Sequence, residues 1–294
     1  MSLCDRRGVS RRDFLRLGAA GAGAVAVAGC VGGPGATPAT PMAQPPPPPP
    51  PPFKIDLGLQ SYSLRAFKFD DVLAKMKEAG IHFVEFTPGH FPMGVKPEEL
   101  AAAQAKLAAA EIKANAYGVC GIGKDEAGAR KLLEFAAKTG IEMVSVDPAP
   151  DAFDAIDKVL ADYPVNIGIH NHGPGSRWTT ADGMLKALEG HHARFGVCLD
   201  TGHLARSGDD PVEATRKLGA AKRLHGFHFK DINAQKHDVV VGTGTIDLVA
   251  IFTTLKEVKF TGPFSLEYEL DAKDPMAGIA KSFAAMREAL AKVS

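Results

Sequence analysis

Residues 56–86, DLGLQSYSLRAFKFDDVLAKMKEAGIHFVEF, contain the pattern that decides the fold. A short apolar run, Asp56–Tyr62, precedes a helical pattern, Asp70–Ala79, and a second apolar run follows at His82–Phe86. A strand, a helix and a strand in succession are typical of a parallel sheet with crossover helices. The stretch therefore predicts one strand–helix–strand unit.

The same alternation continues from this unit to the C-terminus. Further strands are predicted at Ile112–Tyr117, Met143–Val146, Val165–His170, Phe195–Asp200, Leu224–Lys230 and Phe264–Glu267. Further helices are predicted at Pro97–Ala110, Asp125–Thr139, Ala152–Ala161, Thr180–Glu189, Pro211–Leu218, Asp247–Glu257 and Pro275–Lys292. Asp70 is placed to cap the first helix, and Gly80 and Gly140 to end the first and third. Eight strand–helix units predict an α/β fold, a (β/α)8 TIM barrel over residues 53–294.

A doubly wound open sheet is the alternative architecture. Such a sheet usually has a Gly-rich phosphate-binding turn after its first strand. Here Gln60-Ser61-Tyr62-Ser63-Leu64 occupies that place. The barrel is therefore the better interpretation.

Composition limits the classes of function. The 294 residues include 34 acidic and 34 basic side chains, so the chain has no net charge and lacks the basic surface of a nucleic-acid binder. The cysteines are Cys4, Cys30, Cys120 and Cys198. A core of this size needs no disulfide scaffold, and the last two lie in apolar runs. We expect Cys120 and Cys198 to be buried free thiols.

The N-terminal segment reads as an export signal. Residues 10–16, SRRDFLR, match the twin-arginine signal, and the apolar stretch Leu17–Ala28 follows. As a helix this stretch reaches only about 18 Å, too short for a bilayer core of about 30 Å. Residues 27–30, VAGC, resemble a lipobox with Cys30 as the lipidated residue; the alternative is an ordinary cleavage site with an incidental cysteine. We interpret residues 1–30 as a twin-arginine lipoprotein signal peptide.

Residues 31–52 form a Pro-rich linker that ends in the unbroken run Pro45–Pro52. Such a run adopts an extended polyproline II conformation, which would hold the following domain away from a membrane. The expected product is exported by the twin-arginine route and lipid-anchored on the periplasmic or cell-surface side. Its catalytic domain is the barrel.

Ionisable residues gather at the ends of the predicted strands, where barrel enzymes build their active sites. They are Glu85, His90, His170, His172, Asp200, His203, His228, Lys230, Asp231, Glu267 and Glu269. Imidazole and carboxylate groups are ligands that divalent Mn, Co, Zn and Fe favour. Taken singly, Asp200 could cap a turn and His228 could be a core histidine. The set together favours a metal site.

Four segments carry a resemblance to a known family. They are LDTGH at 199–203, HFKD at 228–231, GTG at 242–244 and LEYE at 266–269. In this order they resemble the sugar phosphate isomerase/epimerase family of xylose-isomerase-like barrels, over nearly the whole chain from Lys54 onward. The resemblance implies one divalent metal ion, with Mn, Co, Zn, Fe and Mg as candidates.

The resemblance also implies the metal ligands. Carried over onto this chain, three of them are Asp200, His228 and Glu267. The fourth position departs from the pattern, because the chain reads His170-Asn171-His172 where many relatives have a Glu before Asn-His. His170 can still ligate, which gives two imidazoles and two carboxylates. In many epimerases that Glu is also a base, so the substitution affects the epimerase assignment more than the metal site.

The chemistry expected of such a site is proton transfer beside a carbonyl group. A metal ion that chelates adjacent hydroxyl and carbonyl oxygens acidifies the C–H between them and stabilises the resulting enediolate. A positioned base then decides between epimerisation, isomerisation and elimination. The candidates for base are Glu85, His172 and Glu269; those for acid or substrate-oxygen partner are His203 and Lys230; those for substrate binding are Gln60, His90, Asn171 and Asp231. Each of the acid and base candidates could instead orient the metal ligands.

The predicted export argues against a phosphorylated substrate, and the turn Gly242-Thr243-Gly244 is only a weak phosphate cradle. The sequence therefore predicts a metal-dependent isomerase or epimerase that acts on a non-phosphorylated sugar or keto-sugar. One alternative is a 3-keto-glycoside lyase or hydratase that uses the same chemistry. Another is a non-catalytic sugar-binding lipoprotein, which would need neither base nor metal. Assembly as a homo-oligomer stays open, and a related endonuclease would need a basic face that this chain lacks.

Overall fold

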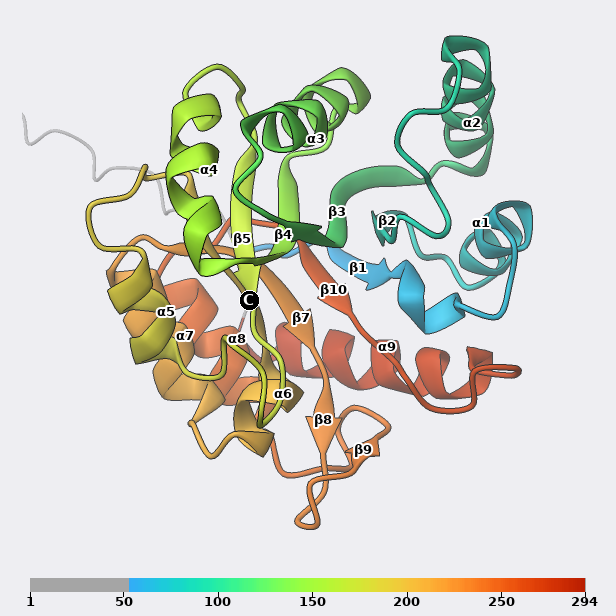
Figure 1. Ribbon diagram of the computed structural model, residues 1–294. Helices are drawn as coiled ribbons and strands as arrows, with labels where there is room; N and C mark the ends of the chain where they lie inside the picture. Colours follow the sequence, from blue (N-terminus) through green and yellow to red (C-terminus); the bar gives the residue numbers. More distant parts are fainter. Residues whose placement is uncertain (1–52, 294) are drawn as a thin grey trace, which may run out of the picture. The chain divides into compact units, whose positions relative to one another are not determined.

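The computed structural model describes residues 53–293, which contain eight parallel strands closed into a barrel (Figure 1). Around the barrel the order is β1-β10-β7-β6-β5-β4-β3-β2. The strands are β1 (Leu57–Gln60), β2 (Phe83–Phe86), β3 (Lys113–Ile122), β4 (Met143–Pro148), β5 (Asn166–His170), β6 (Phe195–Asp200), β7 (Leu224–Phe229) and β10 (Phe264–Leu266). The predicted TIM barrel is confirmed.

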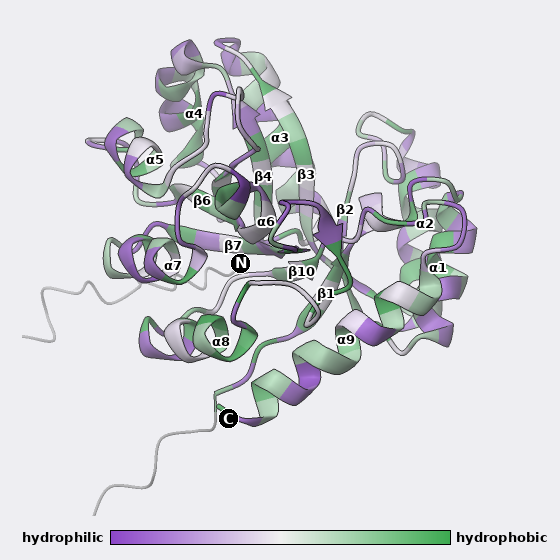
Figure 2. Cartoon of the chain, turned by 90° about the horizontal axis from the view of Figure 1, so that it is seen from below, coloured by the Kyte–Doolittle hydropathy of each residue, from purple (hydrophilic) through white to green (hydrophobic). Residues whose placement is uncertain are grey.

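Helices lie between consecutive strands and surround the barrel (Figure 1). The α-helices are α1 (Phe69–Glu78), α2 (Pro97–Ala110), α3 (Glu126–Thr139), α4 (Phe153–Leu160), α5 (Ala181–Ala187), α6 (Thr201–Arg206), α7 (Pro211–Ala220), α8 (Leu248–Glu257) and α9 (Met276–Ala291), and the 3-10 helices are η1 (Ser61–Leu64) and η2 (Pro150–Ala152). Hydrophobic and hydrophilic residues alternate along them (Figure 2). In α4, for example, Phe153, Ile156 and Val159 are buried, which is the spacing that turns one helical face toward the sheet.

The strand period decides which side chains enter the barrel. On β7, Phe227 and Phe229 pack against Phe264 with ring centroids 5.1 and 6.1 Å apart, and Phe252 of α8 lies 5.4 Å from Phe264. These rings form the layer between the sheet and α8. Because successive side chains of a strand point to opposite faces, His228 points into the barrel. The packing of Phe227 and Phe229 outside the barrel thus fixes His228 on its inside.

The predicted helix ends are partly right. Gly80 and Gly140 follow α1 and α3 with φ of +63° and +76°, a left-handed conformation that glycine adopts without strain. Asp70 does not cap α1, because the helix begins one residue earlier, at Phe69, with Lys68 as its N-cap. The ring of Phe69 packs 5.6 Å from that of Phe86, which draws the chain into the helix sooner. Asp70 instead lies in the first turn, where a carboxylate suits the helix dipole.

Several strand and helix boundaries differ from the predicted ones by one or two residues, and β3 differs by more. β1 ends at Gln60, whose side chain accepts a hydrogen bond from Tyr62 N and so starts η1. β3 continues to Ile122, beyond the predicted end. A small antiparallel pair, β8 (Asp231–Ile232) and β9 (Asp238–Val239), and helix α6 were not predicted, because such short elements show too little periodicity.

Among residues 53–293, no helix is long and apolar enough to cross a membrane. The predicted signal peptide, the linker and Cys30 lie outside the described residues. Within these, Cys120 and Cys198 are buried free thiols, as predicted. Burial raises the pKa of Cys198 to about 11, so its side chain stays a neutral thiol.

Candidate metal centre

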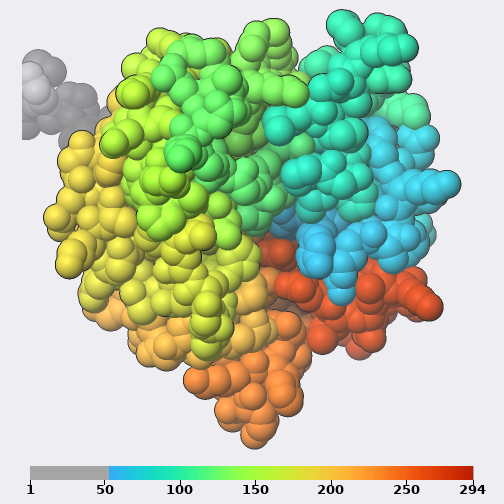
Figure 3. Space-filling model, viewed as in Figure 1, coloured from blue at the N-terminus to red at the C-terminus, as the bar shows by residue number. Residues whose placement is uncertain are grey.

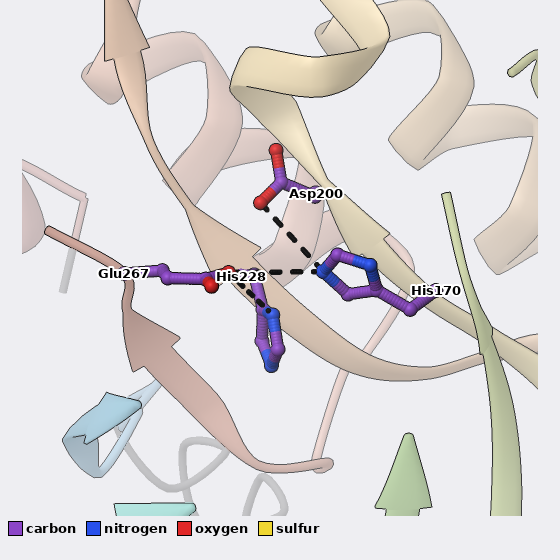
Figure 4. A group of neighbouring side chains, drawn as sticks. All are labelled: His170, Asp200, His228 and Glu267. Atoms are coloured by element: carbon purple, nitrogen blue, oxygen red, sulfur yellow. Dashed lines mark hydrogen bonds and ion pairs between the residues drawn. The ribbon is translucent and has the colours of Figure 1, made fainter. Parts of the chain in front are cut away.

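Four side chains converge at the carboxyl ends of neighbouring strands (Figure 4). His170 ends β5, Asp200 ends β6, His228 lies near the end of β7, and Glu267 follows β10. Each offers one ligand atom, and these atoms all lie within 4.8 Å of one another. All four side chains are buried. The barrel therefore brings together the four residues that the sequence predicts as metal ligands.

Three buried atoms of this cluster have no hydrogen-bond partner within residues 53–293: His170 Nδ1, His170 Nε2 and Asp200 Oδ2. His170 Nε2 lies 3.8 Å from Asp200 Oδ2 and 3.7 Å from Glu267 Oε2, while His228 Nδ1 lies 3.1 Å from Glu267 Oε2. A buried polar atom without a partner costs about 1–3 kcal/mol. A divalent cation bound between these atoms would remove that cost for His170 Nε2 and Asp200 Oδ2. The side chains of His170, Asp200, His228 and Glu267 are therefore suited to bind a divalent cation.

Lys230 lies beside the cluster as a buried cation. Its Nζ is 3.5 Å from both Asp200 Oδ2 and Glu267 Oε2, and it also forms a close ion pair with Glu269. Burial alone would lower the pKa of Lys230, but the three carboxylates outweigh burial and raise it. Burial would likewise raise the pKa of Asp200 and Glu267, and Lys230 more than offsets it, so both values are lowered. Lys230 is thus a fixed charge, which does not suit the predicted role as a proton donor.

The two histidines of the cluster differ in protonation. Burial lowers the pKa of His170 to about 4, so its ring is neutral and has a lone pair for a ligand. Burial would also lower the pKa of His228, but the Glu85 carboxylate and the hydrogen bond with Glu267 outweigh burial and raise it. Without a metal ion, the His228 ring is therefore protonated, and it would have to lose a proton before it could bind a metal ion.

Glu85 does not occupy the position of a catalytic base, which corrects the prediction. Its side chain is fully buried, and Oε2 lies 2.7 Å from His228 Nε2. Oε1 accepts hydrogen bonds from Ser145 Oγ and, at 3.4 Å, from Gln60 Nε2. Glu85 is thus held inside the barrel and is not itself among the residues that line the cavity described next, although its partner Gln60 is.

A cavity of about 640 Å³ opens above the cluster. Figure 3 shows the surface hollowed where the blue segment after β1 meets the red segment after β10. Its lining comprises Gln60, Tyr62, Arg65, Phe67, Thr87, Gly89, His90, Val119, His170, His172, His203, Glu267 and Glu269. Among the described residues, the cavity thus joins two of the four predicted ligands to Gln60, His90, His172, His203 and Glu269 from the predicted set.

The candidate bases that line the cavity are His172 and Glu269. The ring of His172 lies 4.7 Å from that of His170, centroid to centroid, and within residues 53–293 its nitrogens make no hydrogen bond. Glu269 is paired with Lys230 and is 29% exposed. Since a free ring nitrogen can accept a proton without breaking an ion pair, His172 is the better placed of the two.

His203 and His90 line the cavity but are held by their neighbours. The His203 ring lies between two cations, with Lys230 Nζ 3.0 Å from Nε2 and Arg206 Nη1 3.1 Å from Nδ1. Burial chiefly lowers its pKa, so the ring is neutral and better suited to contact substrate oxygens than to donate a proton as an acid. His90 contacts Ser61 Oγ at 2.9 Å and the carbonyl oxygen of Phe67 at 3.1 Å, so it also supports the η1 segment.

Two predicted substrate-binding residues have structural contacts instead. Asn171 pairs with the backbone of Asp200, donating from Nδ2 to its carbonyl oxygen at 2.9 Å and accepting from its N–H at 2.8 Å. This pair holds Asp200 in place. Neither Asn171 nor Asp231 is among the residues that line the cavity.

Both carboxylate oxygens of Asp231 accept hydrogen bonds from backbone N–H groups of the loop after β8. Its Oδ2 accepts from the N–H groups of Gly242 and Gly244 at 2.9 and 2.8 Å. Its Oδ1 accepts from Ile232 and Ile246 at 2.9 and 3.2 Å. The Gly242-Thr243-Gly244 turn is therefore already a carboxylate cradle. The same amides cannot also bind a substrate phosphate, which excludes this turn as a phosphate site.

Arg65, Tyr62 and Ser145 are among the residues at the site that the sequence did not predict. Arg65 donates from Nη2 to the carbonyl oxygen of Glu269 at 2.7 Å, and its guanidinium lies 4.9 Å from the centre of the Tyr62 ring. Arg65 and Tyr62 lie just after β1, at the place where a Gly-rich turn is missing. That missing turn was the feature of the sequence that could have pointed to them. Ser145 was missed as a polar residue inside the apolar run of β4.

Comparison with known proteins agrees with this geometry. The sequence profile of the family described as xylose isomerase-like TIM barrel matches residues 59–289. An inosose dehydratase of Clostridium botulinum is 29% identical over 135 residues, which is 40% of this chain and 44% of that protein. A putative L-ribulose-5-phosphate 3-epimerase of Escherichia coli is 35% identical over 112 residues, 35% of this chain and 37% of that protein. The matched segments thus span less than half the length of these curated relatives.

Solved structures are similar over a larger part of the chain. An uncharacterised protein from Parabacteroides distasonis is 28% identical with a TM-score of 0.63, covering 80% of this chain and 98% of that one. The IolI protein, solved with a binding zinc atom, has a TM-score of 0.69 at 17% identity and covers 82% of this chain and 99% of its own. At that identity the second likeness shows the fold alone.

Proposed function

Because the chain belongs to the xylose isomerase-like TIM barrel family, we propose that it is a divalent-metal-dependent enzyme that removes a proton beside a carbonyl group of a non-phosphorylated sugar or keto-sugar. One observation carries the proposal. The buried cluster of His170, Asp200, His228 and Glu267 contains ligand atoms that have no hydrogen-bond partner within residues 53–293, and it borders a cavity open to small molecules. The names of the curated relatives, a dehydratase and an epimerase, agree with it, because one proton removal can lead to either outcome.

The four residues of the cluster would hold the metal ion. When bound, such an ion acts as a Lewis acid that polarises neighbouring hydroxyl and carbonyl oxygens and acidifies the C–H between them. Lys230, fixed by three carboxylates, adds a permanent positive charge at this end of the barrel. Negative charge that develops on a substrate oxygen is stabilised by such a preorganised charge in a water-poor site.

His172 acts as the base. It lines the cavity next to His170, and its ring nitrogens are free within residues 53–293 to take up a proton from a substrate carbon. Delivery of a proton from a second donor to the other face of the same carbon gives an epimer, and return of the first proton to the neighbouring carbon gives an isomer. Glu269, which borders the same cavity, is the second candidate for this step.

A non-phosphorylated substrate is supported by the charges around the cavity. The glycine turn that could cradle a phosphate is occupied by Asp231. Among the described residues that line the cavity, Arg65 is the one Lys or Arg side chain. Its guanidinium already donates to the carbonyl oxygens of Tyr62 and Glu269. A phosphate dianion would therefore find few free donors, whereas sugar hydroxyls can pair with neutral rings and carboxylates.

The test is hydrogen exchange in deuterated water. The full chain, loaded with Zn²⁺, Mn²⁺ or Co²⁺, is incubated with a panel of keto-sugars, and NMR locates deuterium at the carbon beside the carbonyl group. We expect exchange in the native chain and its loss in His172→Gln with the metal content unchanged. Glu126→Gln, a change at an exposed residue of α3, is the matched control. A native chain that binds metal but exchanges no substrate hydrogen would argue strongly against the proposal, and loss of metal from His172→Gln would make His172 a support of the ligands instead.

Elimination from a 3-keto-glycoside is a second candidate, favoured by the size and walls of the cavity. Its volume of about 640 Å³ lies within the range of about 300–1,000 Å³ that suits drug-sized ligands. Tyr62, which is 42% exposed, and Phe67 give one wall an aromatic surface beside which a leaving group fits. Release of the glycosidic group from 3-keto-glycosides, measured by chromatography, would favour this candidate over epimerisation.

We also propose that residues 1–30 direct export by the twin-arginine route and that Cys30 receives the lipid. The support is the sequence alone: the twin arginines, the short apolar stretch and the cysteine stand in the order of a lipoprotein signal. The Pro-rich linker 31–52 would then separate the catalytic barrel, residues 53–294, from the membrane.

A further inference from the structure

Glu85 and His228 meet across the interior of the barrel. Glu85 belongs to β2 and His228 to β7, and β1 and β10 lie between these strands around the barrel wall. Nevertheless, Glu85 Oε2 lies 2.7 Å from His228 Nε2, and both side chains have no exposed surface. The contact is therefore a direct hydrogen bond in a dry interior, where it is stronger than at a surface.

The orientation of the Glu85 carboxylate is fixed by two other residues. Ser145 of β4 and Gln60 of β1 both donate to Oε1, the latter at 3.4 Å. Gln60 is itself held, because its Nε2 donates to the carbonyl oxygen of Gly118 at 2.8 Å. Oε1 is thus occupied from two sides, which leaves Oε2 to face His228.

The other ring nitrogen of His228 faces the metal cluster. Its Nδ1 lies 3.1 Å from Glu267 Oε2 (Figure 4). A neutral imidazole has one N–H, and the nitrogen that ligates a metal ion must be the bare one. The carboxylates of Glu85 and Glu267 therefore compete for the ring proton from opposite sides. The shorter contact, by 2.7 against 3.1 Å, is the one with Glu85.

We propose that Glu85 is a positioning residue that keeps the ring proton of His228 on Nε2 and so leaves the lone pair of Nδ1 for the metal ion. This inference rests on the proposed metal site. It assigns to Glu85 a role in metal affinity, with no contact to substrate. Without the Glu85 acceptor, the ring proton moves to Nδ1 and Glu267, and the nitrogen that faces the cluster can no longer ligate.

The test measures Zn²⁺ affinity of the metal-free full chain by competition with a chromophoric chelator. Glu85→Met keeps the volume but removes the acceptor. Glu85→Gln turns its amide N–H toward His228, because Ser145 and Gln60 hold the remaining oxygen. We expect Glu85→Met to bind Zn²⁺ about 10–100-fold more weakly, the usual effect of losing such a hydrogen bond to a ligand. Glu85→Gln should also bind Zn²⁺ more weakly, because a donor that faces Nε2 drives the ring proton to Nδ1. In the Zn²⁺-bound native chain, ¹⁵N NMR of the His228 ring should show the proton on Nε2.

The control is Ser282→Ala, which removes a buried hydroxyl of α9 that accepts from Val241 N, away from the cluster. It should leave Zn²⁺ affinity unchanged. Equal Zn²⁺ affinity in the native chain and in either Glu85→Met or Glu85→Gln would overturn the inference. If Glu85→Met does not fold, Glu85→Asp serves instead: its shorter carboxylate should also lose affinity, and unchanged affinity would overturn the role. A native chain that binds no Zn²⁺ would instead refute the metal site itself.

Discussion

His170 Nε2 and Asp200 Oδ2 face each other at 3.8 Å, and within residues 53–293 neither atom has a hydrogen-bond partner. The His170 ring is neutral and the Asp200 carboxylate is ionised, and 3.8 Å is too long for a hydrogen bond between them. A cation bound between these two buried atoms would give both of them a partner.

Metal binding should therefore stabilise the fold. A ligand present at 100 times its dissociation constant adds about 2.7 kcal/mol, which raises the melting temperature of a domain this size by about 5–10 °C. We expect Zn²⁺ to give such an increase in the native chain and no increase in Asp200→Asn, measured by calorimetry. The matched control is Asp182→Asn, at an exposed carboxylate paired with Lys217. An unchanged melting temperature in the native chain with saturating Zn²⁺, Mn²⁺ and Co²⁺ would contradict the metal site.

The stability of the metal-free chain should depend on pH through His170. Its pKa is lowered to about 4 in the folded state, from about 6.5 when unfolded. Between these values the unfolded chain binds a proton that the folded chain does not. The free energy of unfolding should therefore fall as pH falls from 6.5 to 4, by up to about 3 kcal/mol from this residue. Denaturation of the native chain and of His170→Gln at several pH values measures the contribution of His170. If the free energy of unfolding changes equally with pH in both, the predicted contribution is refuted.

Asp231 should affect stability rather than substrate binding. Its carboxylate accepts from four backbone N–H groups and holds the loop after β8. Asp231→Ala should lower the free energy of unfolding by about 2–4 kcal/mol, since hydrogen bonds to a charged group contribute about 1.5–3 kcal/mol each and are not additive. Zn²⁺ affinity at a temperature where the variant is folded should stay within about twofold. A stable Asp231→Ala with weakened substrate binding would restore the role predicted from sequence.

Export and anchoring should depend on two short motifs. Cys30→Ala should release the protein from the membrane into the soluble fraction, because the lipid would have no attachment point. Replacement of Arg11 and Arg12 by Lys should block export. Cell fractionation with immunoblotting measures both. Continued membrane association of Cys30→Ala would rule out the lipid anchor.

Local patterns in the sequence were enough to predict the barrel and the place of its site. The alternation of strands and helices is a short-range property, so it identified all eight strands, and β6 was predicted with its exact ends. Parallel strands that close into a barrel all end at one face. That rule placed the ionisable residues of the strand ends together, and the family resemblance singled out His170, Asp200, His228 and Glu267. The structure brings the ligand atoms of these four within 4.8 Å of one another.

Which partner each polar side chain has was decided only by the tertiary structure. Glu85 and Asp231 end their strands as the other site residues do, so sequence position alone gave both a role at the substrate. Closure of the barrel instead brings Glu85 to His228, 143 residues away, and the return of the loop after β8 covers Asp231 with backbone amides. A strand pattern specifies which face a side chain occupies. The hydrogen-bond partners of that side chain come from segments distant in the sequence, and their positions depend on the packing of the whole domain.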